Sequence, residues 1–130
     1  MTNPPKIAPK GWGSELHIHN SSETGYCGKL LRFTKTGSKF SLHYHIKKTE
    51  TWLFRNRFKV TTIDPVTAQR HTIEVKRDDV IHVLPGVCHQ LEAMEDDAEV
   101  FEVSTPDDPA DSYRVEAGDS QNVAINEPNP

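Results

Sequence analysis

Hydrophobic and polar residues alternate in short runs along most of the chain, and turn-forming residues separate these runs. Successive side chains of a β-strand point to opposite faces, so this alternation is typical of strands buried on one side. The pattern predicts strands at Glu15–His19, Tyr26–Thr34, Phe40–Ile46, Thr51–Phe54, Phe58–Ile63, Gln69–Val75, Val80–Leu84, His89–Met94 and Glu99–Ser104. A spacing of roughly 8–12 residues between strands is typical of a sandwich or barrel. We therefore expect an all-β protein, a jelly-roll-like barrel.

The two ends of the chain differ from this middle part. Three of the nine prolines fall within the first ten residues, which predicts an extended arm over residues 1–10. Residues 119–130 are polar and predict a flexible tail. The barrel itself is expected over residues 11–118, with one short helical turn within Pro106–Tyr113.

The composition narrows the class of protein. A chain of 130 residues is expected to form one domain. Its 15 basic and 19 acidic residues leave a net charge of −4, which argues against binding to nucleic acid or to an anionic membrane. The sequence shows neither an apolar stretch of about 20 residues nor a secretory signal, so we expect a cytoplasmic protein. The two cysteines, Cys27 and Cys88, are expected to be reduced thiols.

Three of the seven histidines and one glutamate stand where strand alternation brings metal-ligating groups together. His43 and His45 share one face of a predicted strand, and Glu50 begins the next apolar run. His89 follows a Pro-Gly turn at the start of another strand. Three imidazoles and one carboxylate make a four-ligand set for one divalent first-row metal: Fe, Mn, Zn or Ni.

The spacing of these residues resembles the two motifs of the cupin superfamily. The first motif has a glycine, then His-x-His and a glutamate, which match Gly37, His43, His45 and Glu50. In the second motif, Gly86 and His89 match the glycine and the histidine. The resemblance implies a double-stranded β-helix, the jelly-roll cupin barrel, with His43, His45, Glu50 and His89 as the metal ligands.

Four positions depart from these motifs, and all four belong to turns rather than to the ligand set. Arg57, Asp78, Leu84 and Ala93 stand where the motifs have glycine, glycine, proline and asparagine. Asn56, next to Arg57, tolerates a left-handed backbone and is expected to close the first turn instead.

A narrower resemblance covers residues 10 to 118. The sequences KGWGSE at 10–15 and PGVCHQ at 85–90, with Trp52, Phe101–Val103, Asp107-Asp108 and Tyr113-Arg114, are similar to mannose-6-phosphate-isomerase-like cupins. This resemblance implies a sugar-phosphate isomerase-like enzyme in which the metal acts as a Lewis acid. Isomerisation also needs a base, for which Glu92, Glu102 and Lys47 are unranked candidates.

Two other functions remain open at this point. A three-His, one-Glu site also suits a non-haem Fe(II) dioxygenase, and some cupins are non-catalytic binding modules for sugars or other small ligands. Each alternative expects a small molecule as the partner. Fold analogy further suggests a homodimer in which the N-terminal arm is exchanged.

Four further residues are candidates for lining a substrate pocket: Trp52, Phe54, Lys47 and Leu91. Trp52 and Phe54 share the face of Glu50 and form either the core wall or a platform for substrate. Lys47 lies in the loop between ligand strands and is either solvated or able to capture an anion. The remaining histidines are expected to be ordinary, with His17 and His19 on a solvated strand face and His82 packed or hydrogen-bonded.

Overall fold

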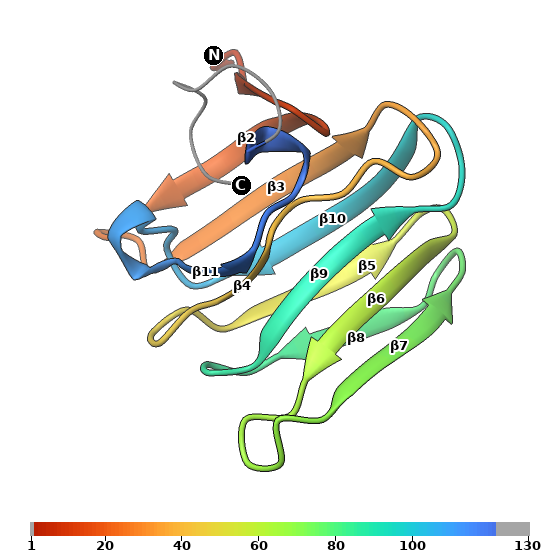
Figure 1. Cartoon of the computed structure of the whole chain (residues 1–130). Helices are drawn as coiled ribbons and strands as arrows, with labels where there is room; N and C mark the ends of the chain where they lie inside the picture. Colours follow the sequence, from red (N-terminus) through yellow and green to blue (C-terminus); the bar gives the residue numbers. More distant parts are fainter. Residues whose placement is uncertain (1, 122–130) are drawn as a thin grey trace.

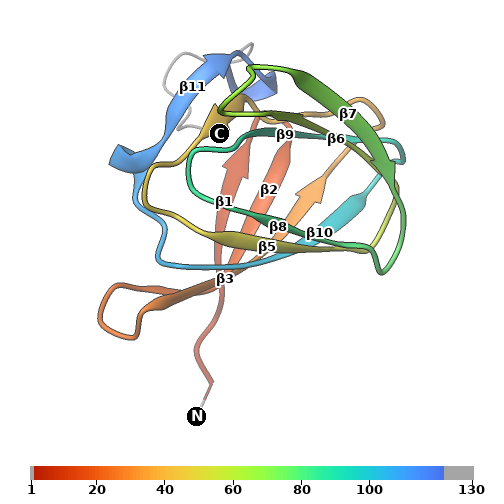
Figure 2. The same cartoon turned by 90° about the horizontal axis from the view of Figure 1, so that it is seen from below.

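The computed structural model describes residues 2–121, which fold into two facing antiparallel sheets with two short 3-10 helices (Figures 1 and 2). The strands are β1 (Lys6–Lys10), β2 (Gly13–Ser21), β3 (Tyr26–Phe33), β4 (Leu42–Tyr44), β5 (Glu50–Phe54), β6 (Phe58–Ile63), β7 (Arg70–Val75), β8 (Val80–Val83), β9 (Cys88–Ala93), β10 (Ala98–Ser104) and β11 (Tyr113–Glu116). One sheet has the order β1-β2-β3-β10-β5-β8, and the other has the order β11-β4-β9-β6-β7. This arrangement confirms the predicted all-β jelly roll.

All nine predicted strands are present, as β2 to β10, and the helical turn expected within Pro106–Tyr113 is the 3-10 helix η1 (Pro109–Asp111). The alternation did not predict β1 or β11. Within the expected arm, Lys6–Lys10 pair with β2 at the sheet edge, where Pro9 is tolerated because an edge strand leaves some amides unpaired. At the other end, η2 (Asp119–Gln121) buries Ser120, and the rest of the expected tail lies outside the described residues.

Inward-facing side chains change from apolar to polar along several strands. On β5 the buried residues are Phe54, Trp52 and then Glu50, and on β3 they are Phe33, Leu31, Lys29 and then Cys27. The apolar portion forms a core in which Trp12 stacks on Phe33 with ring centroids 4.5 Å apart. The polar portion brings ionisable groups of both sheets together at one side of this core.

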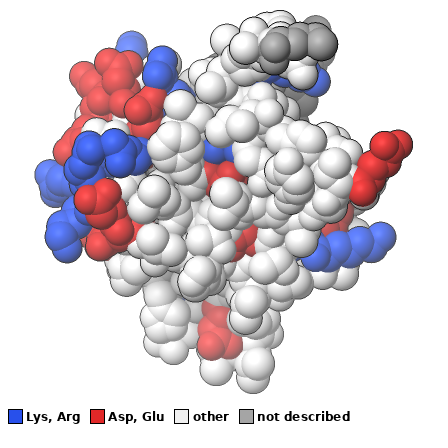
Figure 3. Space-filling view, turned by 180° about the vertical axis from the view of Figure 1, so that it is seen from behind, with Lys and Arg blue, Asp and Glu red and all other residues white. Residues whose placement is uncertain are grey.

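The outer face of the six-stranded sheet carries a row of apolar side chains. Each member lies opposite the next across a strand pair: Ile7, Leu16, Leu30, Phe101, Leu53 and Val80. The molecule seen from behind is mostly uncharged over the middle of this face, with charged side chains gathered towards its sides (Figure 3).

The described residues contain no helix that is both long and apolar enough to cross a membrane. Cys27 and Cys88 are buried free thiols, as expected.

Candidate metal centre

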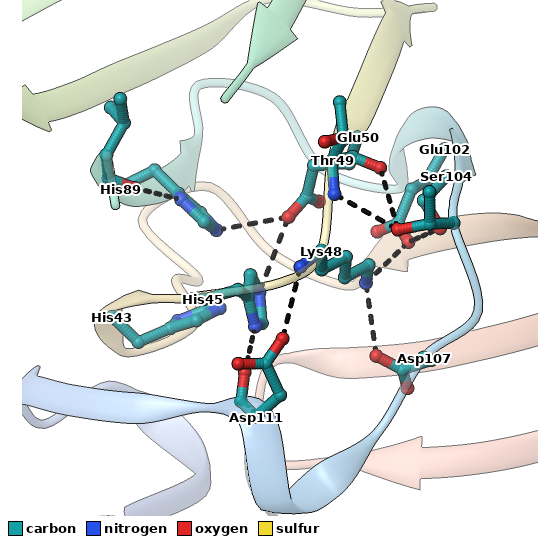
Figure 4. A network of polar contacts seen from close by, with 12 residues as sticks. His43, His45, Lys48, Thr49, Glu50, His89, Glu102, Ser104, Asp107 and Asp111 are labelled. Carbon is teal, nitrogen blue, oxygen red and sulfur yellow. Dashed lines mark hydrogen bonds and ion pairs between the residues drawn. The ribbon is translucent and has the colours of Figure 1, made fainter. Parts of the chain in front are cut away.

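His43, His45 and His89 converge on one point between the two sheets. One ring nitrogen of each lies within 4.8 Å of the others, and all three side chains are buried. His43 on β4 pairs directly with His89 on β9, and His45 follows at the end of β4 (Figure 4). The predicted alternation therefore places His43 and His45 on the same inward face.

Each imidazole is oriented by a hydrogen bond to a backbone carbonyl. Nδ1 of His43 donates to Ser41 O at 2.7 Å, Nδ1 of His45 to Asp111 O at 2.6 Å, and Nδ1 of His89 to Val87 O at 2.9 Å. A carbonyl oxygen only accepts, so Nδ1 carries a proton and Nε2 is the ring nitrogen that can bind a metal. Burial lowers the pKa of His43 and of His89, which keeps both rings neutral at neutral pH.

Glu50 adds a carboxylate to the cluster. Its Oε2 lies 3.4 Å from Nε2 of His45 and 3.5 Å from Nε2 of His89, while its Oε1 accepts a hydrogen bond from Nε1 of Trp52 at 2.9 Å. Burial opposes ionisation of Glu50, but the nearby His89 and Lys48 outweigh it and hold its pKa well below the usual range.

Two buried atoms at this point have no hydrogen-bond partner among residues 2–121: Oε2 of Glu50 and Nε2 of His89. A buried polar atom without a partner is costly, and a cation held between the two atoms would satisfy both. Three imidazole nitrogens and one carboxylate oxygen are ligands that suit divalent first-row metals. The residues present therefore fit a metal ion.

A cavity of about 330 Å³ opens onto this cluster. Its wall contains a chain of ion pairs that runs away from the metal ligands (Figure 4). Lys48 Nζ lies 2.9 Å from Glu102 Oε2 and 3.1 Å from Asp107 Oδ1, and Lys29 Nζ lies 2.9 Å from Asp107 Oδ2 and 3.3 Å from Glu15 Oε1.

The groups deep in this wall carry an excess of negative charge. Two ammonium groups, of Lys29 and Lys48, face four carboxylates, of Glu15, Glu50, Glu102 and Asp107, which leaves an excess of two negative charges. Lys6, Lys10 and Asp108 also line the cavity; Lys6 and Asp108 are exposed, and Lys10 is half-buried like Glu15. With these three groups included, the excess is one negative charge. Burial and the nearby Glu50 raise the pKa of Glu102, although Lys48 favours its charged form. A divalent cation at the histidine cluster would balance the excess charge.

The other predicted pocket residues lie elsewhere. Trp52, Phe54 and Leu91 are fully buried in the hydrophobic core, and Lys47 is exposed in the loop after β4. These four are not among the described residues that line the cavity, whereas Lys48, the neighbour of Lys47, is. Two of the three candidate bases, Glu92 and Lys47, are also not among the lining residues, and Glu102 is.

Sequence reasoning missed several residues of the cavity wall. Lys29 shares the face of Leu31 and Phe33, a parity that could have marked it as inward-facing. His17 was expected on a solvated face, but it is half-buried, lines the cavity and contacts Glu15 Oε1 through Nε2 at 2.9 Å. A bulge in β2 between His17 and His19 separates the two rings. His82 is exposed and hydrogen-bonded to Thr51, as expected.

The backbone of two turns bears on the departures from the motifs: it explains why Asp78 can replace a glycine, and it shows that the expectation for Asn56 was wrong. Gly37 and Gly86 have φ of 89° and 84°, and Asp78, which replaces a motif glycine, has φ of 73°. An aspartate tolerates this left-handed region better than most residues. Asn56 does not adopt a left-handed backbone. Its side-chain oxygen instead accepts a hydrogen bond from the backbone N–H of Glu99, and its side-chain nitrogen donates one to the carboxylate of Glu95.

No protein-family model matches the sequence, and no curated protein matches it. Solved structures do resemble it. Oxalate decarboxylase from Bacillus subtilis superimposes with a TM-score of 0.73 and 19% identity over 85% of this chain and 30% of that one. The chain has the cupin fold. The capsular polysaccharide assembling protein CapF from Staphylococcus aureus superimposes with a TM-score of 0.74 and 20% identity, over 89% of this chain and 34% of that one.

The chain spans about a third of the length of these two proteins or less. The Bacillus oxalate decarboxylase contains Mn(II) centres. At these identities the comparison establishes the shared fold alone.

Proposed function

We propose that this cupin binds one divalent first-row metal through Nε2 of His43, His45 and His89 and a carboxylate oxygen of Glu50. The supporting observation is the orientation of the three rings. Each turns its protonated Nδ1 to a backbone carbonyl, and Nε2 of His45 and of His89 lie 3.4 Å and 3.5 Å from Oε2 of Glu50, which has no hydrogen-bond partner among the described residues. Fe, Mn, Zn and Ni all accept such ligands. Manganese gains support from the Mn(II) centres of oxalate decarboxylase.

We further propose that the cavity binds a small polar molecule and that the protein acts as an isomerase on a sugar phosphate or a related hydroxy-carbonyl compound. A bound metal would supply Lewis-acid polarisation of a carbonyl oxygen. The cavity volume of about 330 Å³ lies at the small end of the range for ligand sites. Glu102 is the preferred base, because it lines the cavity and burial raises its pKa towards the range useful for proton transfer.

Elemental analysis of the purified protein, with metal titrations of the chelator-treated protein, tests the metal centre. We expect about one metal ion per chain. His43→Ala and His89→Ala should each weaken metal binding by more than about 100-fold, which exceeds the loss typical when a residue that only orients a ligand is replaced. His82→Ala is the matched control, since His82 is exposed and bonded to Thr51. A wild-type protein that holds no stoichiometric Fe, Mn, Zn or Ni would contradict the proposal.

The reaction is tested with the metal-loaded protein. Turnover of a sugar phosphate or of a related hydroxy-carbonyl compound, lost in Glu102→Gln, is the expected result. Oxygen uptake by the Fe(II)-loaded protein would favour the dioxygenase alternative instead. Tight binding of an unchanged sugar would favour the binding module.

We also propose that the protein is a homodimer in which the apolar row on the outer face of the six-stranded sheet meets its copy. Phe101 lies at the middle of this row and is exposed, as are Ile7 and Val80 at its ends. An apolar patch on one face suits a two-fold interface, because the same patch serves both subunits. Phe101→Glu should shift the sedimentation coefficient to that of a monomer. Ile73→Glu, at an exposed position of β7 in the other sheet, should not. A monomeric wild-type protein would refute the proposal.

A further inference from the structure

The carboxylate of Asp107 bridges two lysines inside the cavity. Its Oδ1 lies 3.1 Å from Lys48 Nζ (Figure 4), and its Oδ2 lies 2.9 Å from Lys29 Nζ, so that each oxygen faces one ammonium group. The lysine side chains are only 4% and 5% exposed, whereas that of Asp107 is 27% exposed. Buried lysines are rare unless they are paired, so the two ammonium groups need an anion at this position.

The two lysines are held by the barrel independently of Asp107. Lys29 lies on β3 directly opposite Glu102 of β10 and contacts Glu15 of β2, while Lys48 contacts Glu102. Both ammonium groups are thus fixed by carboxylates of the six-stranded sheet. They form a preorganised pair of cations that faces the cavity.

Asp107 is supplied by a connection rather than by a strand. It lies between the end of β10 at Ser104 and the start of η1 at Pro109, and its backbone N–H donates to Oδ1 of Asn20 at 3.0 Å. Removing this side chain from the lysines requires a movement of the connection and no rearrangement of a sheet. Three carboxylates contact the two lysines, those of Glu15, Glu102 and Asp107. That of Asp107 is therefore the one that another anion can replace.

We propose that the Lys29–Lys48 pair is a binding site for the carboxylate group of a small molecule, and that Asp107 occupies it until that molecule displaces it. The inference rests on the proposed function in one respect, that a small polar molecule enters this cavity. A carboxylate reproduces the planar two-oxygen bridge of Asp107 and exchanges one negative charge for another. A phosphate monoester would bring more charge into a wall that already carries an excess of carboxylates. Of the two substrate classes proposed above, the site thus favours a hydroxy-carbonyl compound that carries a carboxylate, such as a small hydroxy or oxo acid, over a sugar phosphate.

Calorimetric titration with glycolate tests the site, with glycolamide as the uncharged probe of matching shape. Asp107→Ala removes the internal competitor, so it should bind glycolate at least about tenfold more tightly than the wild type does, because no charge-assisted contact has to be broken first. Asp108→Ala is the control, because Asp108 lines the same cavity but bonds to the amide of Ala110. The affinity of Asp108→Ala for glycolate should match that of the wild type. Glycolamide should bind neither protein.

Asp107→Asn guards against misfolding of the alanine variant, since it keeps the side-chain shape and removes only the charge. It should also gain affinity for glycolate. In the wild type, saturating glycolate should speed hydrogen exchange of the Asp107 amide as its bond to Asn20 is released. Equal affinities in wild type and both Asp107 variants, or preferential binding of inorganic phosphate, would overturn the inference.

The same titrations on chelator-treated protein separate this inference from the metal proposal. If the metal-free Asp107 variants bind glycolate more tightly than the metal-free wild type, the carboxylate site is supported even if no metal binds. A protein that binds metal stoichiometrically but shows no such gain would keep its metal centre and lose the carboxylate site.

Discussion

Asp111 and His45, which are 66 positions apart, are joined by a 2.6 Å hydrogen bond from Nδ1 of the ring to the carbonyl oxygen of Asp111. The carboxylate of the same aspartate accepts hydrogen bonds from the backbone N–H groups of Ile46, Lys47 and Lys48, at 2.9, 3.0 and 3.1 Å. One residue of η1 therefore orients a candidate metal ligand and also holds the loop that carries Lys48. The C-terminal part of the chain is in this way coupled to the centre of the barrel.

We predict that Asp111→Ala weakens metal binding by about tenfold, a typical loss for a group that orients a ligand. The carbonyl remains in the variant, but the loop loses three backbone hydrogen bonds and no longer fixes His45. Asp111→Asn keeps one acceptor oxygen and should lose less affinity. Metal titrations of chelator-treated proteins provide the measurement, and an unchanged affinity in Asp111→Ala would refute the coupling.

Trp52 supports the carboxylate of Glu50 by the 2.9 Å hydrogen bond from its indole nitrogen. We predict that Trp52→Phe lowers the metal affinity by about tenfold, because Glu50 Oε1 loses its donor while the ring remains aromatic and apolar. Phe54→Leu is the control, since Phe54 belongs to the same core but has no polar contact with Glu50. That variant should lose stability and keep the affinity for metal. Equal affinities in both variants would show that the indole does not position the carboxylate.

Lys47 and Lys48 are adjacent in sequence and differ in burial, which makes them a matched pair. Lys48→Met should lower the free energy of unfolding by about 3–5 kcal/mol, because the buried Glu102 and the half-buried Asp107 lose this cation. Lys47→Met, at an exposed position, should change it by less than about 0.5 kcal/mol. Urea unfolding of the two variants distinguishes them. A Lys48→Met protein as stable as the wild type would contradict the structural role of the ion-pair chain.

The outcome for Lys47 illustrates where sequence reasoning ends. Alternation correctly placed His43, His45, Glu50, Trp52 and Phe54 on inward faces, because strand parity is a local property. Parity does not tell which inward residues meet a cavity and which meet the core, since that depends on how the strands are staggered. The loop after β4 has no period, so the pattern could not choose between Lys47 and Lys48.

Contacts between distant parts of the chain escaped prediction for the same reason. Lys29 meets Asp107 from 78 positions away, and neither residue shows its partner in the local pattern. The edge strands β1 and β11 were also missed. Both are short and largely exposed, and β1 contains a proline, so the alternation that identifies half-buried strands is absent there.

The ion pairs of Asp107 also make the free energy of unfolding depend on pH. Burial alone would raise the pKa of Asp107, but Lys48 and Lys29 outweigh it and hold the pKa well below the usual range. Because the pKa is lower in the folded than in the unfolded chain, the charged pair stabilises the fold fully above the unfolded value of about 3.9. That stabilisation is lost as the pH falls through the lower value of the folded state.

Asp107→Asn removes this contribution and leaves the other carboxylates in place. Between about pH 7 and about pH 2.5, the wild type should therefore lose about 2 kcal/mol more unfolding free energy than the variant. Urea unfolding across this range, in chelator at constant ionic strength, provides the measurement. Parallel curves for the two proteins would mean that Asp107 has the same proton affinity in the folded and unfolded chains, and that the two lysines do not hold its charge. A steeper loss in Asp107→Asn would reverse the expected sign and contradict the bridging ion pair itself.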